Sequence, residues 1–167
     1  MEKGIDYLLR ALSMVKIRSK VFIIGEGTQV PYLKRMAKSL SAKHEIIFTG
    51  WIKNSELTAF YSQATLAVVP SIWPEPFGII GIEAMANRIP VVAFNVGGVS
   101  EWLVDGQTGY LVPQRNEKAL AEKITFFLEN PDVAAAMGDR GRKLVEKRFV
   151  PEVHINNLLA LFEKLHI

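Results

Sequence analysis

Two glutamates eight positions apart, Glu75 and Glu83, are the side chains best placed for chemistry. Glu75 lies between Pro74 and Pro76, so its loop has little conformational freedom and can present the carboxylate in a fixed position. Glu83 lies among Ile, Gly, Ala and Met residues, where a carboxylate buried without a partner is costly. We therefore expect Glu83 to hydrogen-bond to a partner such as a pair of ligand hydroxyls, so that both carboxylates could meet one bound sugar nucleotide.

An ordinary structural role for Glu83 stays open at this stage. The side chain could lie on the single wet face of its helix, or it could bond a nearby loop amide. The residues between the two glutamates add a further feature, because Phe77–Ile80 would form a helix entrance. Free backbone N–H groups and the helix dipole favour a diphosphate there, and Gly78 permits close backbone approach.

Other motifs give weaker signals. Gly25-x-Gly27 follows an apolar run, but the third glycine of a dinucleotide fingerprint is missing at the expected offset. The next strand also ends on Phe48-Thr49, without the acidic residue such a site needs. A nicotinamide enzyme is therefore disfavoured. We assign no catalytic role to the three histidines and expect them to be surface or packing residues; they are His44, His154 and His166.

The candidate residues must be positioned by strands and helices. Along the chain, short apolar runs typical of strands alternate with longer patterns typical of helices. We expect strands over 21–24, 45–49, 65–69, 91–94 and 110–112. We expect helices over 6–12, 31–40, 55–63, 79–87 and 116–129, with Pro131 and Pro151 opening two more and with Ser55 and Asn116 as N-caps.

This alternation, with strands apolar on both faces, predicts an α/β fold. We expect a single doubly wound parallel sheet with helices on both faces and three C-terminal helices forming a cap. The whole chain, 1–167, is expected to be one domain. Ligands of such folds bind at the carboxyl ends of the strands, where the loops are 25–30, 50–54, 71–78 and 95–100.

Composition narrows the function classes. The 167 residues are 49% hydrophobic and include no cysteine, which excludes disulfides, thiolate zinc sites and a cysteine nucleophile. Residues 1–43 carry nine Lys or Arg against three Asp or Glu, so this segment could meet a phosphate-bearing ligand or an anionic membrane, or simply form solvated helix faces. Aromatic–basic interleaving is absent, so nucleic acid is not an expected partner. We expect a cytoplasmic protein, with peripheral contact to the inner face of a membrane left open.

The segment from Pro74 to Ala86 resembles the donor-site signature of family 4 glycosyltransferases (group 1). The resemblance rests on Glu75-x7-Glu83, with Pro-Phe-Gly after the first glutamate and Glu-Ala-Met-Ala at the second. It continues in order through 90–93, 97–101 and 105–112, and upstream through 2–6, 24–27, 48–50 and 69–71. These enzymes have the GT-B fold, in which the active site lies between two Rossmann-like domains. The resemblance implies that this chain is the C-terminal, donor-binding half.

Roles for individual residues follow from the resemblance alone. It implies that Glu83 binds the ribose hydroxyls, that Glu75 contacts donor-sugar hydroxyls and that Lys3 neutralises the diphosphate, which makes Glu75 and Lys3 the catalytic candidates. The remaining donor-binding candidates are the backbone of Phe77, Gly78, Ile79 and Ile80 for the sugar and diphosphate, Gly25 for the phosphates, and Trp51, Ile52 and Lys53 for the nucleobase.

The start of the chain departs from the family pattern. Relatives have a strand ending in Gly-Arg shortly before the Lys-Gly pair, whereas here the chain begins at Met1-Glu2-Lys3. We therefore expect the first strand and the N-terminal acceptor domain to be missing from 1–167, and an acceptor glycan or lipid to be met by that domain. An exposed sheet edge would favour association with another chain or self-association.

The resemblance implies a retaining, metal-independent glycosyltransferase. It would move a sugar from a nucleotide-diphosphate sugar, which is a substrate and not a cofactor, to an acceptor hydroxyl. Two alternatives stay open: a nucleotide-sugar binding module that is inactive on its own, and a sugar-nucleotide epimerase or phosphorylase on the same fold.

Overall fold

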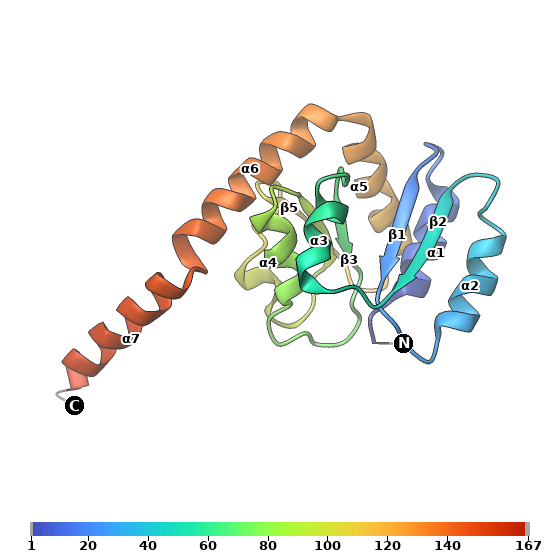
Figure 1. Ribbon diagram of the computed structural model, residues 1–167. Coiled ribbons are helices and arrows are strands. Elements are labelled where there is room, and N and C mark those ends of the chain that lie inside the picture. The colour runs from blue at the N-terminus through green and yellow to red at the C-terminus, as the bar shows by residue number, and fades with distance from the viewer. Residues whose placement is uncertain (1, 166–167) are drawn as a thin grey trace.

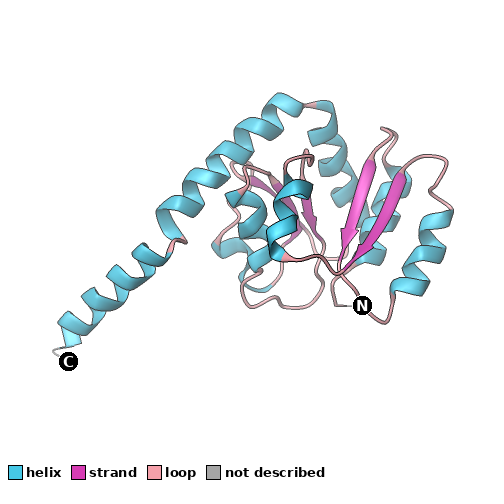
Figure 2. Cartoon of the chain, in the orientation of Figure 1, coloured by secondary structure: helices cyan, strands magenta, loops and turns pink. Residues whose placement is uncertain are grey.

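Strands and helices alternate through the computed structural model, which describes residues 2–165. In chain order the elements are α1 (Ile5–Met14), β1 (Lys20–Ile24), α2 (Val30–Lys38), β2 (Glu45–Gly50), α3 (Asn54–Tyr61), β3 (Ala67–Val69), α4 (Ile79–Ala86), β4 (Val91–Phe94), the 3-10 helix η1 (Gly97–Glu101), β5 (Gly109–Val112), α5 (Glu117–Glu129), α6 (Pro131–Arg148) and α7 (Pro151–Leu165). The expected α/β class is therefore confirmed, and Figure 2 shows strands flanked by helices. The short η1 helix was not expected from the sequence.

The strands form two parallel sheets instead of the single sheet expected. β1 pairs with β2, and β3, β4 and β5 pair in that order. In the view of Figure 1, β1 is the strand of its sheet that lies nearer to β3. These two strands do not pair with each other, so each leaves an edge, here called the inner edge, with no strand partner among residues 2–165. The arrows of β1, β2 and β3 point toward the bottom of Figure 1. The carboxyl ends of both sheets therefore lie on that side of the molecule.

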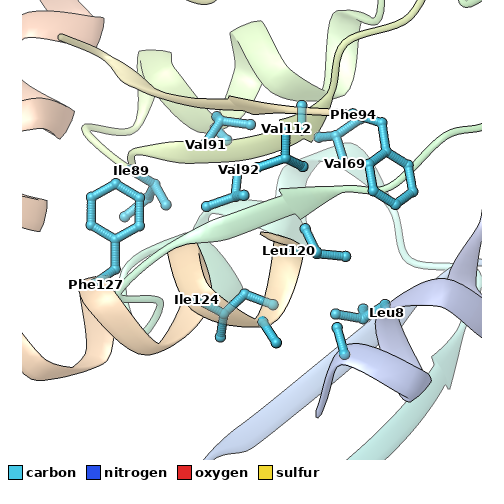
Figure 3. Close-up of a cluster of buried hydrophobic side chains, with 14 of the residues drawn as sticks. Leu8, Val69, Ile89, Val91, Val92, Phe94, Val112, Leu120, Ile124 and Phe127 are labelled. Carbon is cyan, nitrogen blue, oxygen red and sulfur yellow. The ribbon is translucent and has the colours of Figure 1, made fainter. Parts of the chain in front are cut away.

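The core is centred on the three-stranded sheet. All four residues of β4 are buried, and Figure 3 shows Val92 among Val112 of β5 and two residues of α5, Leu120 and Ile124. α4 and α6 pack together and contact the same sheet. β2, by contrast, is only half-buried along most of its length. Apolar burial, the main driving force of folding, is thus unevenly shared between the two sheets.

Helix starts follow the expected signals with one exception. Asn116 caps α5, since its Oδ1 accepts a hydrogen bond from the Ala119 N–H at 2.9 Å, and prolines begin α6 and α7. The expected N-cap Ser55 is wrong. α3 begins one residue earlier, and its cap position is held by Lys53 in an extended conformation without a side-chain hydrogen bond.

The expected cap of three C-terminal helices is only partly present. α5 and α6 pack on the sheet and on helices of the body, whereas α7 extends away from it and contacts α6 (Figure 1). Several large apolar side chains of α7 are consequently exposed: Ile155, Leu158, Leu159, Leu161 and Phe162. No helix within residues 2–165 combines the length and apolar character needed to cross a membrane.

Candidate functional site

Two of the expected site residues, 72 positions apart, form an ion pair. Lys3 Nζ lies 2.8 Å from Glu75 Oε2. The lysine side chain is 63% exposed and the glutamate 19%, so the pair opens to solvent on the lysine side. Buried Ser71, which directly follows β3 and Pro70, lies with its Oγ 3.2 Å from the same carboxylate oxygen. Glu75 is therefore held from two directions.

Backbone contacts bring the two segments of this pair together. The Glu2 carbonyl accepts the Ile72 N–H at 2.9 Å and the Trp73 N–H at 3.3 Å. Gly4, which caps α1, has a φ of +61°, and a Cβ there would lie 1.8 Å from the Pro70 carbonyl oxygen. Only glycine fits so close an approach at a positive φ. The Lys-Gly pair thus places Lys3 beside the loop after β3.

Two glycines after β4 clamp the other side of the Glu75 loop. The Gly98 N–H donates to the Glu75 carbonyl at 2.9 Å. Gly97 has a φ of +52°, and a Cβ at that position would lie 2.3 Å from the same carbonyl oxygen. The 97–101 motif is visible in the sequence, but this supporting role is not. The glycines let the β4 loop support the backbone that carries the carboxylate.

The entrance of α4 rests on a buried tryptophan that the sequence analysis did not identify. Trp102 is fully buried, and its indole N–H donates to the Phe77 carbonyl. A Cβ at Gly81 would lie 2.0 Å from the Trp102 ring, so the small residue in α4 lets the indole pack beneath the helix. Gly78 caps α4 with a φ of +84°, and Ile79 and Ile80 are exposed. The Gly81 N–H donates to the Gly78 carbonyl at 3.0 Å. The N–H groups of Ile79 and Ile80, the first two residues of the helix, have no partner within it and are available to an anion.

Glu83 is half-buried on α4, close to Tyr61 at the end of α3. Burial raises the pKa of the Tyr61 hydroxyl above its usual value, and the negative charge of Glu83 raises it further. Within residues 2–165 no side chain or amide hydrogen-bonds the Glu83 carboxylate, so the loop-amide role considered above is not present. The carboxylate can therefore accept hydrogen bonds from a ligand.

A second group of expected residues lies at the carboxyl ends of β1 and β2. The Gly25 N–H donates to the Gly50 carbonyl at 2.8 Å, and the two glycines help line a pocket of about 450 Å³. Trp51, the next residue, is 68% exposed, and its N–H lies 3.4 Å from Glu26 Oε1. Glu26 also lines the pocket. Its place between two glycines was the sequence signal that could have identified it.

Comparison with known protein families identifies the family of this chain. Residues 1–144 match the family described as glycosyl transferases group 1. The chain belongs to this family.

Relatives and solved structures agree with that assignment. This group 1 chain is 36% identical over 122 residues (72% of this chain, 31% of the relative) to an uncharacterized glycosyltransferase of Methanocaldococcus jannaschii. It is 35% identical over 149 residues (84% of this chain, 39% of the relative) to the GDP-mannose-dependent alpha-(1-6)-phosphatidylinositol monomannoside mannosyltransferase of Mycolicibacterium smegmatis. Its fold resembles that of Anabaena HepE in complex with UDP and glucose, with 25% identity and a TM-score of 0.86 over 98% of this chain and 45% of that one. The chain thus spans less than half of each of these proteins.

The structure divides the expected site residues of this group 1 glycosyltransferase chain between the two sheets. Lys3, Glu75 and the backbone of 77–80 lie together beside β3 and β4, and Glu83 follows them one turn along α4. Gly25 and the segment 51–53 lie at the ends of β1 and β2, with Ile52 half-buried and Lys53 exposed. Within residues 2–165, no group of three or more His, Cys, Asp or Glu is arranged to hold a metal ion.

Proposed function

We propose that residues 1–167 form the donor-binding domain of a retaining family 4 glycosyltransferase. The full enzyme would transfer a sugar from a nucleotide-diphosphate sugar to an acceptor hydroxyl. The single observation that carries this proposal is the Lys3–Glu75 pair, which sets a cation and a carboxylate 2.8 Å apart beside the free N–H groups of α4. Such a site can bind the diphosphate and the sugar of one ligand at once.

Each group has a separate role in this proposal. Lys3 and the amides of 77–80 would stabilise the negative charge that develops on the diphosphate as the bond to the sugar breaks. Glu75 would accept hydrogen bonds from sugar hydroxyls, and Glu83 would accept them from the ribose. The pocket lined by Gly25 and Gly50, with Trp51 to Lys53 beside it, would receive the nucleobase.

The charge on the leaving group would be met by fixed protein groups, and we therefore propose a reaction that requires no metal ion. The Lys3 ammonium is mostly exposed, so its ion pair with Glu75 can open to admit a diphosphate. Transfer assays with and without EDTA test metal independence. Determining the anomeric configuration of the product tests retention.

We also propose that a strand and an acceptor-binding domain outside 1–167 complete the enzyme. The unpaired inner edges of β1 and β3 support this, because a parallel strand that preceded Gly4 could pair with both. The acceptor, a glycan or a lipid, would be met through that further domain. In its absence the exposed edges favour self-association. We place the reaction in the cytoplasm, with the basic segment 1–43 contacting the inner face of a membrane.

Calorimetry with UDP, GDP, ADP and their sugar derivatives tests donor binding. Replacing Glu83 by Gln is expected to weaken binding of the preferred nucleotide by about 1–3 kcal/mol, the usual range for a lost charged hydrogen bond. Glu122→Gln is the matched control, because Glu122 is an exposed residue of α5. Unchanged nucleotide affinity in the Glu83 variant would refute its ribose role.

Turnover assays separate the remaining alternatives. A binding module inactive on its own would bind the nucleotide sugar without transfer or hydrolysis, and transfer by this chain alone would exclude it. An epimerase would release inverted sugar without an acceptor, whereas a phosphorylase would require inorganic phosphate.

A further inference from the structure

A second pocket lies between α2 and β2 and is lined by residues from His44 to Phe48 on the strand side. Its volume is about 410 Å³. The residues that matter to its chemistry are Lys34, Lys38, Ser41, His44, Ile46 and Phe48. Two of them, Lys34 and Phe48, also line the pocket proposed above to receive the nucleobase.

His44 lines the pocket and has an unused hydrogen-bonding atom in its ring. Its side chain is 2% exposed, and its Nε2 lies 2.9 Å from the Leu12 carbonyl oxygen. A carbonyl can only accept, so Nε2 carries the proton, and Nδ1 of the neutral ring is an acceptor. Nδ1 is buried and has no hydrogen-bond partner among residues 2–165. Buried polar atoms are rarely left unpaired, which points to a ligand that supplies a donor.

Two lysines give the pocket a positive charge. Neither Lys34 nor Lys38 takes part in an ion pair within residues 2–165, and no acidic residue lines the pocket. Lys34 Nζ lies 5.8 Å from the centroid of the Phe48 ring, which fixes this ammonium close to the pocket wall. Ile46 and Phe48 make one side apolar. The pocket therefore combines cations, an apolar wall and one buried acceptor.

We propose that this pocket binds a phosphate group, either free hydrogen phosphate or the phosphate of a sugar phosphate. The anionic oxygens would lie between Lys34 and Lys38, with the Ser41 hydroxyl as a further donor. An O–H of the ligand, from hydrogen phosphate or from the sugar, would donate to His44 Nδ1. A sugar ring would pack against Phe48. This site adjoins the pocket proposed for the nucleobase and shares Lys34 and Phe48 with it, but its binding of phosphate does not depend on the function proposed for that pocket.

NMR titrations of the folded chain at constant ionic strength test the proposal, with inorganic phosphate, glucose 6-phosphate and glucose as the probes. Both phosphates are expected to shift the resonances of Lys38, Ser41 and the His44 ring, whereas glucose is not. Lys38→Gln is expected to weaken phosphate binding at least fivefold. Arg35→Gln is the matched control, because it removes one charge from an exposed position of α2 outside the pocket and should change the affinity less than twofold.

The outcomes separate the two sources and can overturn the proposal. Tighter binding of glucose 6-phosphate than of phosphate supports a sugar phosphate, and equal binding supports free phosphate. The proposal fails if neither ligand shifts these resonances, or if the Arg35 variant loses as much affinity as the Lys38 variant. His44→Gln adds a second readout, since a folded variant with full affinity would also overturn it. UDP titrations read at Gly25 and Gly50, which line the nucleobase pocket and not this one, report on the donor site separately.

Discussion

The two sheets of the molecule differ in how firmly they hold the residues at their carboxyl ends. The three-stranded sheet has a fully buried central strand, β4, and beside it the fully buried Trp102. The two-stranded sheet is half-exposed along β2, and residues of β2 line two pockets. The groups proposed to meet the reacting bond belong to the first sheet, and those proposed to meet the base belong to the second.

The glycines show the same contrast. A Cβ at Gly97 would collide with the backbone of the Glu75 loop, whereas a Cβ at Gly25 or Gly27 would meet nothing within 4 Å. Tight backbone packing fixes the position of a charged group, which electrostatic stabilisation of a leaving group requires. An open loop suits a base that is contacted largely through backbone. We therefore expect substitutions to be more damaging beside the three-stranded sheet.

Truncation of the buried tryptophan is the strongest test of this contrast. Trp102→Ala is expected to lower the free energy of unfolding by about 3–5 kcal/mol, because it leaves a cavity and removes the donor to the Phe77 carbonyl. Phe22→Ala in β1 should cost roughly 1–2 kcal/mol, since Phe22 is only half-buried and packs edge-on against Phe60. Urea unfolding monitored by circular dichroism measures both. Equal losses would contradict the contrast between the sheets.

Substitution of glycine by alanine beside each sheet has the next largest expected effect on stability. Gly97→Ala should destabilise the chain by about 2–3 kcal/mol, because the new methyl group overpacks the Glu75 backbone at a positive φ. Gly27→Ala should change stability by less than about 0.5 kcal/mol, since the space around Gly27 is open. Thermal unfolding ranks the two variants. Nucleotide-sugar affinity should fall with Gly97→Ala, and its preservation would show that the Glu75 loop tolerates displacement.

A double-mutant cycle on Lys3 and Glu75 probes a smaller interaction. With the lysine mostly exposed, we expect a coupling energy of about 0.5–1 kcal/mol from Lys3→Gln, Glu75→Gln and the double variant. The coupling should shrink as salt is raised, because screening weakens exposed pairs. Arg142 and Glu146, an exposed pair within α6, provide the reference of about 0.3–0.5 kcal/mol. A Lys3–Glu75 coupling no greater than this would mean that the loop after β3 adds nothing to the pair.

Much of the fold could be predicted from local signals. Apolar runs ended by glycine or proline located the strands to within about two residues, and Asn116 and the prolines located helix starts. An exposed sheet edge was expected from the departure at the start of the chain, but the local signals of β1 and β3 could not show that these two strands leave the sheet divided in two. The exposure of α7 was missed for a similar reason, since an amphipathic pattern does not reveal whether a partner is present.

Candidate site residues could be named from the sequence where a residue type was unusual in its surroundings. Glu75 between prolines and Glu83 in an apolar helix were unusual in sequence, and the resemblance added Lys3. Supporting residues gave no such signal. Trp102 is an ordinary core residue by type, and Ser71 is one small hydroxyl after a strand. Their roles depend on contacts between segments far apart in the chain.

The helix α3 connects the two halves, and the ionisation of Tyr61 tests that connection. Phe60 of α3 packs on Phe22 of β1, while the next residue, Tyr61, feels the charge of Glu83 on α4. Burial is the larger cause of the raised pKa of Tyr61 and Glu83 the smaller, so Glu83→Gln should lower this pKa only slightly. Ultraviolet titration of tyrosinate measures the shift, with Tyr61→Phe identifying the signal.

The same shift predicts how stability depends on pH. A tyrosine pKa that is higher in the folded than in the unfolded chain means that the unfolded chain releases its proton first as the pH rises past 10.0. The contribution of Tyr61 is therefore complete below that pH and is lost as the pH rises through the folded pKa. Tyr61→Phe should flatten this part of the stability profile, and Glu83→Gln should reduce its slope by less. If Glu83→Gln left the Tyr61 pKa unchanged, no charge effect would couple α3 to α4, and α3 would join the two halves through packing alone.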